Sequence, residues 1–152
     1  VEALLADPAA ADEAGLDIGD VGLAAYSIAG EDPARGRTIL DDYVTLHPDD
    51  ADGHAVAGIY DIDILLAVGD QIAAADEGNI DLILERSLGS LTDALDLDPE
   101  YPDVLVYRSF VHFFLERFDA ARTDLAAYDN LAAGRGDLDE LIAAYGLRAA
   151  LE

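Results

Sequence analysis

The amino-acid sequence predicts an all-α fold. Apolar residues recur at three- and four-residue steps over long segments, as in Leu82, Ile83, Leu88, Leu91 and Leu95, and this spacing places them on one face of a helix. Glycine and proline residues, which end or interrupt helices, separate these segments. No stretch shows the alternating pattern of a half-buried strand. We therefore expect one domain made of roughly seven to eight helices in antiparallel pairs.

The helix breakers set the order of the elements. They are expected at Gly30, Pro33, Pro48, Gly53, Gly78, Pro99, Pro102, Gly134 and Gly136. Residues 51–76 and 79–97 are expected to form two helices longer than their neighbours, because few breakers interrupt them. Asp137 and Glu140 have the spacing of a capping box, which predicts a last helix within 136–152.

One sequence motif suggests that the helix pairs belong to a repeating unit. Ala-Leu-Asp-Leu-Asp-Pro at 94–99 is followed by Val-Tyr-Arg-Ser at 106–109 and by Arg-Phe-Asp-Ala-Ala at 117–121. This spacing resembles the tetratricopeptide repeat, a helix–turn–helix unit of about 34 residues. The resemblance implies a short right-handed α-solenoid of stacked antiparallel helix pairs with a C-terminal capping helix. It also implies a non-enzymatic scaffold that binds a peptide or protein segment.

The repeat spacing divides a single domain of residues 1–152 into five parts. They are the tail of a preceding unit at 1–16, a repeat at 17–50, a repeat with an insertion at 51–101, a repeat at 102–135 and a capping helix at 136–152. The resemblance places small residues at Ala24, Gly36, Gly58, Ser109 and Ala121. It also implies that Arg108 contacts Asp124 across the two helices of one repeat.

Charge is the second strong signal. The chain has 33 acidic residues against 8 arginines, no lysine, and a net charge of −25. Such a surface repels itself in dilute buffer, whereas molar salt shortens the Debye length to about 3 Å and screens the repulsion. The composition is similar to that of proteins from salt-accumulating halophiles. An acidic groove for a basic peptide is the alternative, and nucleic acid is disfavoured because no basic stripe is present to contact phosphates.

Several function classes are disfavoured by what the sequence lacks. No apolar run approaches the length of a transmembrane helix, so no membrane span is expected. The absence of cysteine excludes disulfides and thiolate chemistry. No serine lies in a nucleophile elbow and no glycine-rich phosphate loop is present, so we expect no enzymatic activity and no cofactor. The localisation stays open, with the cytoplasm favoured.

The candidate partner-binding residues come from the repeat resemblance, which places them on the concave face of the first helices. They are Ile59, Ile62, Val106, Phe110, Phe113 and Phe114. The alternative is that the phenylalanines pack beneath the final helix or beneath the insertion. The second candidate surface is the long hairpin of the inserted repeat, whose projecting apolar residues need a cover. These are Ile64, Leu65, Ile72, Ile80, Leu82 and Ile83.

One weak metal-site candidate is present. His47, Asp49, Asp50, Asp52 and His54 combine carboxylates with imidazoles, which suit hard and borderline cations respectively. The pattern fails as a calcium loop, since no glutamate closes it. We therefore expect a plain acidic turn and no metal.

Three classes of function remain open. The leading class is the interaction scaffold. The second is a structural module that self-associates into a homo-oligomer. The third is a carrier of a small ligand or metal, similar to some periplasmic tetratricopeptide proteins.

Overall fold

The fold is all-helical over the part of the chain that the structure describes. The computed structural model describes residues 14–75, 77–131 and 146–151. Within these ranges every regular element is an α-helix and none is a strand, which confirms the all-α prediction. Among the same residues, no helix is long and apolar enough to cross a membrane.

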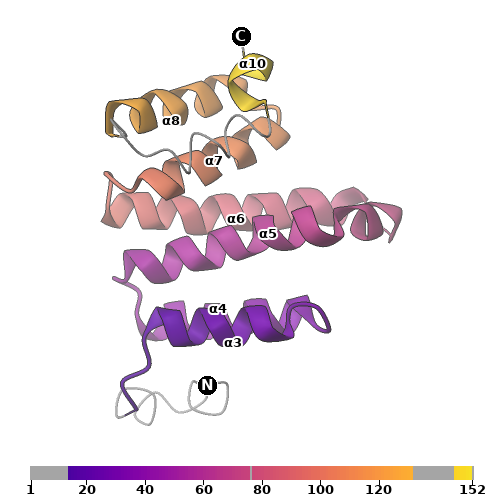
Figure 1. The fold of residues 1–152 in the computed structure, drawn as a ribbon, viewed down its shortest axis with the longest axis vertical. Coiled ribbons are helices and arrows are strands. Elements are labelled where there is room, and N and C mark those ends of the chain that lie inside the picture. Colours follow the sequence, from indigo (N-terminus) through magenta and orange to yellow (C-terminus); the bar gives the residue numbers. More distant parts are fainter. Residues whose placement is uncertain (1–13, 76, 132–145, 152) are drawn as a thin grey trace.

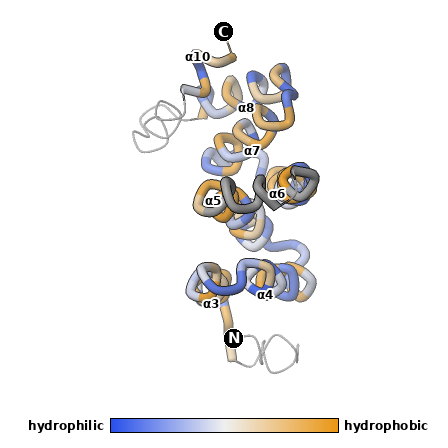
Figure 2. The backbone as a smooth tube through the Cα atoms, turned by 90° about the vertical axis from the view of Figure 1, so that its right-hand side faces the viewer, coloured by the Kyte–Doolittle hydropathy of each residue, from blue (hydrophilic) through white to orange (hydrophobic). Residues whose placement is uncertain are grey.

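The helices form antiparallel hairpins that stack in layers (Figure 1). Their bounds are α3 Ile18–Ile28, α4 Pro33–Leu46, α5 Ala51–Ala75, α6 Glu77–Leu97, α7 Pro102–Phe114, α8 Phe118–Leu131 and α10 Leu147–Leu151. The layers are α3 with α4, α5 with α6, and α7 with α8. Seen end-on in Figure 2, α3 and α5 lie on one side of the stack, and α4 and α6 lie on the other.

Short-range sequence signals explain where the helices begin. Asp17 caps α3 by accepting a hydrogen bond from the backbone N–H of Asp20 (3.0 Å), and Asp32 caps α4 in the same way. Pro33 and Pro102 occupy the first helical turns of α4 and α7, where a missing N–H costs nothing. These two prolines therefore start helices.

Gly53 does not break a helix, contrary to the sequence prediction. It lies within the first turn of α5, where a Cβ atom would sit 3.0 Å from the Tyr43 ring. The glycine permits close packing of α4 on α5 at this point. Gly78 likewise falls inside α6 rather than before it.

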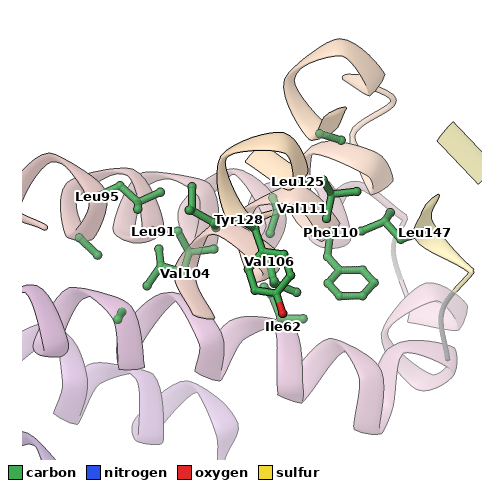
Figure 3. Close-up of a cluster of buried hydrophobic side chains, with 14 of the residues drawn as sticks. Ile62, Leu91, Leu95, Val104, Val106, Phe110, Val111, Leu125, Tyr128 and Leu147 are labelled. Carbon is green, nitrogen blue, oxygen red and sulfur yellow. The ribbon is translucent and has the colours of Figure 1, made fainter. Parts of the chain in front are cut away.

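Within the described residues, two apolar clusters form the core. The smaller one joins α3, α4 and α5 through Val21, Ala25, Ile39, Leu40, Tyr43, Ala57 and Tyr60. The larger one joins α5, α6, α7, α8 and α10, and includes Leu91, Val104, Val106, Val111 and Tyr128, all fully buried (Figure 3). Burial of each large apolar side chain contributes about 1.5–3 kcal/mol, so the stacked layers hold each other together.

The helices approach each other most closely at small residues. A methyl group on Gly36 of α4 would overlap the Tyr60 hydroxyl of α5 and lie 2.8 Å from the Ala25 carbonyl oxygen of α3. A methyl group on Gly58 of α5 would lie 2.6 Å from Cγ of Leu91. Both glycines therefore lie at close contacts between neighbouring helices.

The middle hairpin is longer than the others. α5 has 25 residues and α6 has 21, whereas α7 has 13 and α8 has 14. Both long helices extend past the ends of α4 and α7 on one side of the stack (Figure 1). The two longer helices expected at 51–76 and 79–97 are thereby confirmed.

The two ends of the chain lie partly outside the described residues. The predicted capping box of Asp137 and Glu140 falls outside them, as does most of the tail at 1–16. At the C-terminal end, α10 buries Leu147 and Leu151 in the larger core. Arg122 of α8 donates a hydrogen bond from Nε to the Leu151 carbonyl oxygen (2.7 Å).

Candidate functional site

An apolar hollow of about 280 Å³ lies where the long hairpin meets the end of α7. Side chains from α5, α6 and α7 line it, namely Ile62, Leu65, Leu66, Ile80, Asp81, Leu84 and Phe114. Ile62 and Leu84 are buried at its floor, while Leu66 (47%) and Phe114 (48%) are about half exposed at its mouth. Apart from Asp81, the described side chains that line the hollow are all apolar.

The end of α7 explains why the hollow is open. Glu116 adopts a left-handed conformation (φ 58°), and the backbone N–H of Arg117 donates to the His112 carbonyl oxygen (2.8 Å). These are the features of a Schellman helix end. α7 therefore stops at Phe114 while α5 and α6 continue beside it, and the apolar surface of the hairpin loses its cover at this point.

Aromatic surface continues from the hollow towards α8. The Phe113 ring lies 5.9 Å from the Phe114 ring, edge to face, and 5.7 Å from the Phe118 ring. Phe118 is 40% exposed. Contacts of this geometry hold the rings in fixed positions. The exposed ring of Phe114 is therefore supported from behind by a half-buried neighbour.

The structure separates the six predicted partner-binding residues by burial. Ile62, Val106 and Phe110 are buried in the larger core (3%, 0% and 4% exposed), so they offer little surface to a partner. Ile59 and Phe113 are partly buried against the same core. Of the six, Phe114 is the exposed side chain, and Ile62 reaches the hollow only as its floor.

The residues predicted to project from the long hairpin lie on more than one surface. Leu65 and Ile80 line the apolar hollow. Ile64 and Ile83 instead line a second hollow of about 200 Å³ on the α4 side of the hairpin, and Leu82 is 69% exposed. The side chain of Ile72 lies outside those that the structure describes.

A buried ionic network lies beside this second hollow. Asp61 of α5 is 1% exposed. Its carboxylate accepts hydrogen bonds from Arg37 of α4 and from Arg86 Nε (3.0 Å) and Nη2 (2.5 Å) of α6. Arg37 also donates to the Ala57 carbonyl (2.6 Å) and to the Ser90 hydroxyl (2.9 Å). The network ties three consecutive helices together.

Burial and ion pairing act on the Asp61 carboxyl in opposite directions. Burial raises the pKa of Asp61 above its ordinary value, against the opposing hydrogen bond from Arg86 and the charge of Arg37. This means that desolvation outweighs pairing. The network therefore fixes the relative positions of α4, α5 and α6 and contributes little net free energy of folding.

The predicted Arg108–Asp124 contact is present. Arg108 Nε and Nη2 donate to the two carboxylate oxygens of Asp124, at 2.8 and 2.7 Å. The His112 side chain places Nε2 3.8 Å from Asp124, while its buried Nδ1 has no hydrogen-bond partner among the described residues. Burial lowers the pKa of His112.

Tyr26 of α3 contacts two residues of α5. Its ring lies 5.1 Å from the Tyr60 ring, edge to face, and its hydroxyl donates to Asp63 (2.7 Å). Burial, followed by the hydrogen bond and charge of Asp63, raises the pKa of Tyr26 above its ordinary value. Leu23 on the same helix is 74% exposed.

The weak metal candidate is not assembled. Within the described residues, no group of three or more histidine or carboxylate side chains could hold a metal ion. His54 Nε2 lies 3.0 Å from the Pro48 carbonyl oxygen, Asp50 accepts from the Tyr43 hydroxyl, and Asp52 accepts from Tyr101 (both 2.7 Å). The remaining two members of the set are His47, whose ring stacks on Tyr43, and the exposed Asp49. His54, Asp50 and Asp52 thus make hydrogen-bond contacts within the fold, and the Asp52 contact reaches the start of α7.

Comparison with known proteins gives no family. The chain matches no protein-family model, and no curated protein or solved structure is significantly similar to it.

Proposed function

We propose that the protein is a non-enzymatic, tetratricopeptide-like interaction scaffold, arranged as a short right-handed α-solenoid. It binds a protein or peptide segment at the apolar hollow beside the long hairpin. The proposal rests on one observation. Two apolar side chains, Phe114 and Leu66, are about half exposed at the mouth of a hollow whose described lining is apolar apart from Asp81. Exposed apolar surface of this kind is typical of interaction sites.

The packing supports the repeat interpretation. Ser109 and Ala121 are fully buried at the positions that the repeat spacing assigns to small residues, as Gly36 and Gly58 are at close helix contacts. Turns fall at Pro48 and Pro99 between the helix pairs. The remaining departure from the repeat is the long hairpin, which forms two walls of the hollow.

The size of the hollow favours a side chain over a small molecule. Sites that enclose small molecules measure roughly 300–1,000 Å³ and bury most of the ligand. A hollow of about 280 Å³ lies at the lower limit of this range, and it opens at Leu66 and Phe114. It would enclose a small molecule only in part, and it suits an apolar side chain of a longer segment. Such an anchor in a preformed pocket is the usual centre of a protein–protein interface.

The polar groups support a non-enzymatic role. The Ser87 and Ser109 hydroxyls donate to the backbone carbonyls of Gly58 (2.9 Å) and Val106 (2.6 Å). Ser90 accepts from Arg37. These side chains satisfy helix contacts, which is a structural use of the hydroxyl group.

A selection from a random peptide display library tests this function. Peptides enriched on the native protein should lose binding to Phe114→Asp, which places a charge at the mouth of the hollow. Leu97→Asp is the matched control, since Leu97 is comparably exposed (42%) but lies about 25 Å along α6 from Ile80. Peptides that bind both variants equally, or a native protein that associates with itself through this face in sedimentation, would contradict the proposal.

A further inference from the structure

The rim of the apolar hollow carries a carboxylate, that of Asp81, which is unpaired among the described residues. Asp81 of α6 lines the hollow and is exposed. Among the described residues, no hydrogen bond or ion pair engages its side chain. One helical turn further along α6, Glu85 is already paired with Arg117. The apolar anchor site therefore has a single negative charge at its edge that has no partner within the described part of the chain.

We propose that the segment bound in the hollow carries a lysine or arginine close in sequence to its apolar anchor, and that this cation pairs with Asp81. The inference rests on the proposed function and adds the chemistry of the partner to it. The anchor side chain displaces water from the walls formed by Leu65, Leu66 and Phe114. Exclusion of water strengthens a nearby ion pair, so the two contacts support each other.

Charge selects this partner over a second copy of the chain. Each copy has a net charge of −25 and no lysine, so two copies brought face to face repel each other unless salt screens them. A basic segment meets no such barrier, and complementary charge also raises its rate of association. The hollow fixes where the apolar anchor of the segment binds, and the pairing of its cation with Asp81 fixes the direction in which the segment runs.

The test uses the peptides enriched on the native protein, labelled for fluorescence anisotropy. Asp81→Lys reverses the charge at the rim. Asp42→Lys is the matched control, because Asp42 is also exposed but lies on α4, in a neighbouring layer. We expect enriched peptides to combine a large apolar residue with a nearby lysine or arginine. Asp81→Lys should weaken their binding by roughly fivefold, and Asp42→Lys by clearly less.

Binding is measured at the lowest KCl concentration at which circular dichroism shows each variant to be folded, and again in molar KCl. The effect of Asp81→Lys should shrink in molar salt. Enriched peptides with neutral or acidic flanks, or equal losses for the two lysine variants, would overturn the basic-partner inference and leave the interaction scaffold standing. Peptides whose binding is insensitive to Phe114→Asp would overturn both.

Discussion

Replacement of Asp61 by asparagine tests whether the buried ionic network ties the layers together. Asn has nearly the same shape as Asp but no charge, so the change removes the partner of Arg37 and leaves the packing intact. Arg37 is 5% exposed and keeps its contacts to Asp41 (2.9 Å), the Ala57 carbonyl and Ser90. Of these partners, only Asp41 carries a charge, and it lies at the surface, 52% exposed.

The expected cost follows from burial. Removal of one partner of a buried pair leaves an uncompensated charge and costs about 3–5 kcal/mol. This is a large part of the free energy of unfolding of a typical domain, which is roughly 5–15 kcal/mol. Arg86→Gln should cost less than about 1 kcal/mol, because the Arg86 side chain is 47% exposed and its partner Asp61 retains Arg37. The double variant Arg37→Met/Asp61→Asn removes the stranded charge. It should therefore cost about 1–3 kcal/mol less than the sum of the two single changes.

Urea unfolding followed by far-UV circular dichroism in molar KCl measures these free energies. The denaturant slope must stay constant across the variants for the comparison to hold. If Asp61→Asn cost no more than Arg86→Gln, the carboxylate would not be the central group of the network. Strict additivity of Arg37→Met and Asp61→Asn would show that the two side chains act independently, contrary to their direct contact.

Three further measurements test other parts of the structure. The melting temperature should rise by more than roughly 10 °C from dilute buffer to molar KCl as the charge of −25 is screened, and a flat profile would remove the halophile hypothesis. Because burial lowers the pKa of His112, the unfolded chain takes up this proton first as the pH falls below about 6.5. As the pH falls, the free energy of unfolding of the unmodified protein should therefore decrease more steeply than that of His112→Gln. Parallel curves of free energy against pH for the two proteins would contradict this. Gly36→Ala should destabilise by about 1–3 kcal/mol because the new methyl group overlaps Tyr60. Gly89→Ala, which meets nothing within 4 Å, should instead stabilise by about 0.5–1 kcal/mol, and similar effects of the two changes would refute the close helix contact.

The fold was predictable because its determinants are short-range. Helix faces, first-turn prolines and the long uninterrupted runs at 51–76 and 79–97 depend on spacings of a few residues, which a sequence displays directly. The contact between Arg108 and Asp124 was also predictable, because the repeat resemblance places the two side chains opposite each other within one helix pair. Gly53 was misread because a glycine that ends a helix and one that permits close packing look alike in the sequence.

The site was less predictable because it depends on where helices end relative to each other. The repeat resemblance placed Val106 and Phe110 on the concave face, but both lie in the larger core, together with residues of the long hairpin and of the C-terminal helix α10. The network at Asp61 was missed for a different reason. Among 33 acidic residues, one buried carboxylate has no local signature, and its partners lie 24 and 25 residues away.

The arginines show how an acidic chain can still form specific contacts between its layers. Arg37 and Arg86 meet at Asp61 between α4, α5 and α6, and Arg108 joins α7 to α8. Arg117 pairs with Glu85 of α6, and Arg148 of α10 pairs with Asp129 of α8. These cations lie at joints between helices, so the remaining surface is left strongly acidic. Salt screens the exposed charges far more than the buried pair of Arg37 and Asp61. Added salt should therefore weaken the repulsion between surface carboxylates while the Arg37–Asp61 contact between α4 and α5 is preserved.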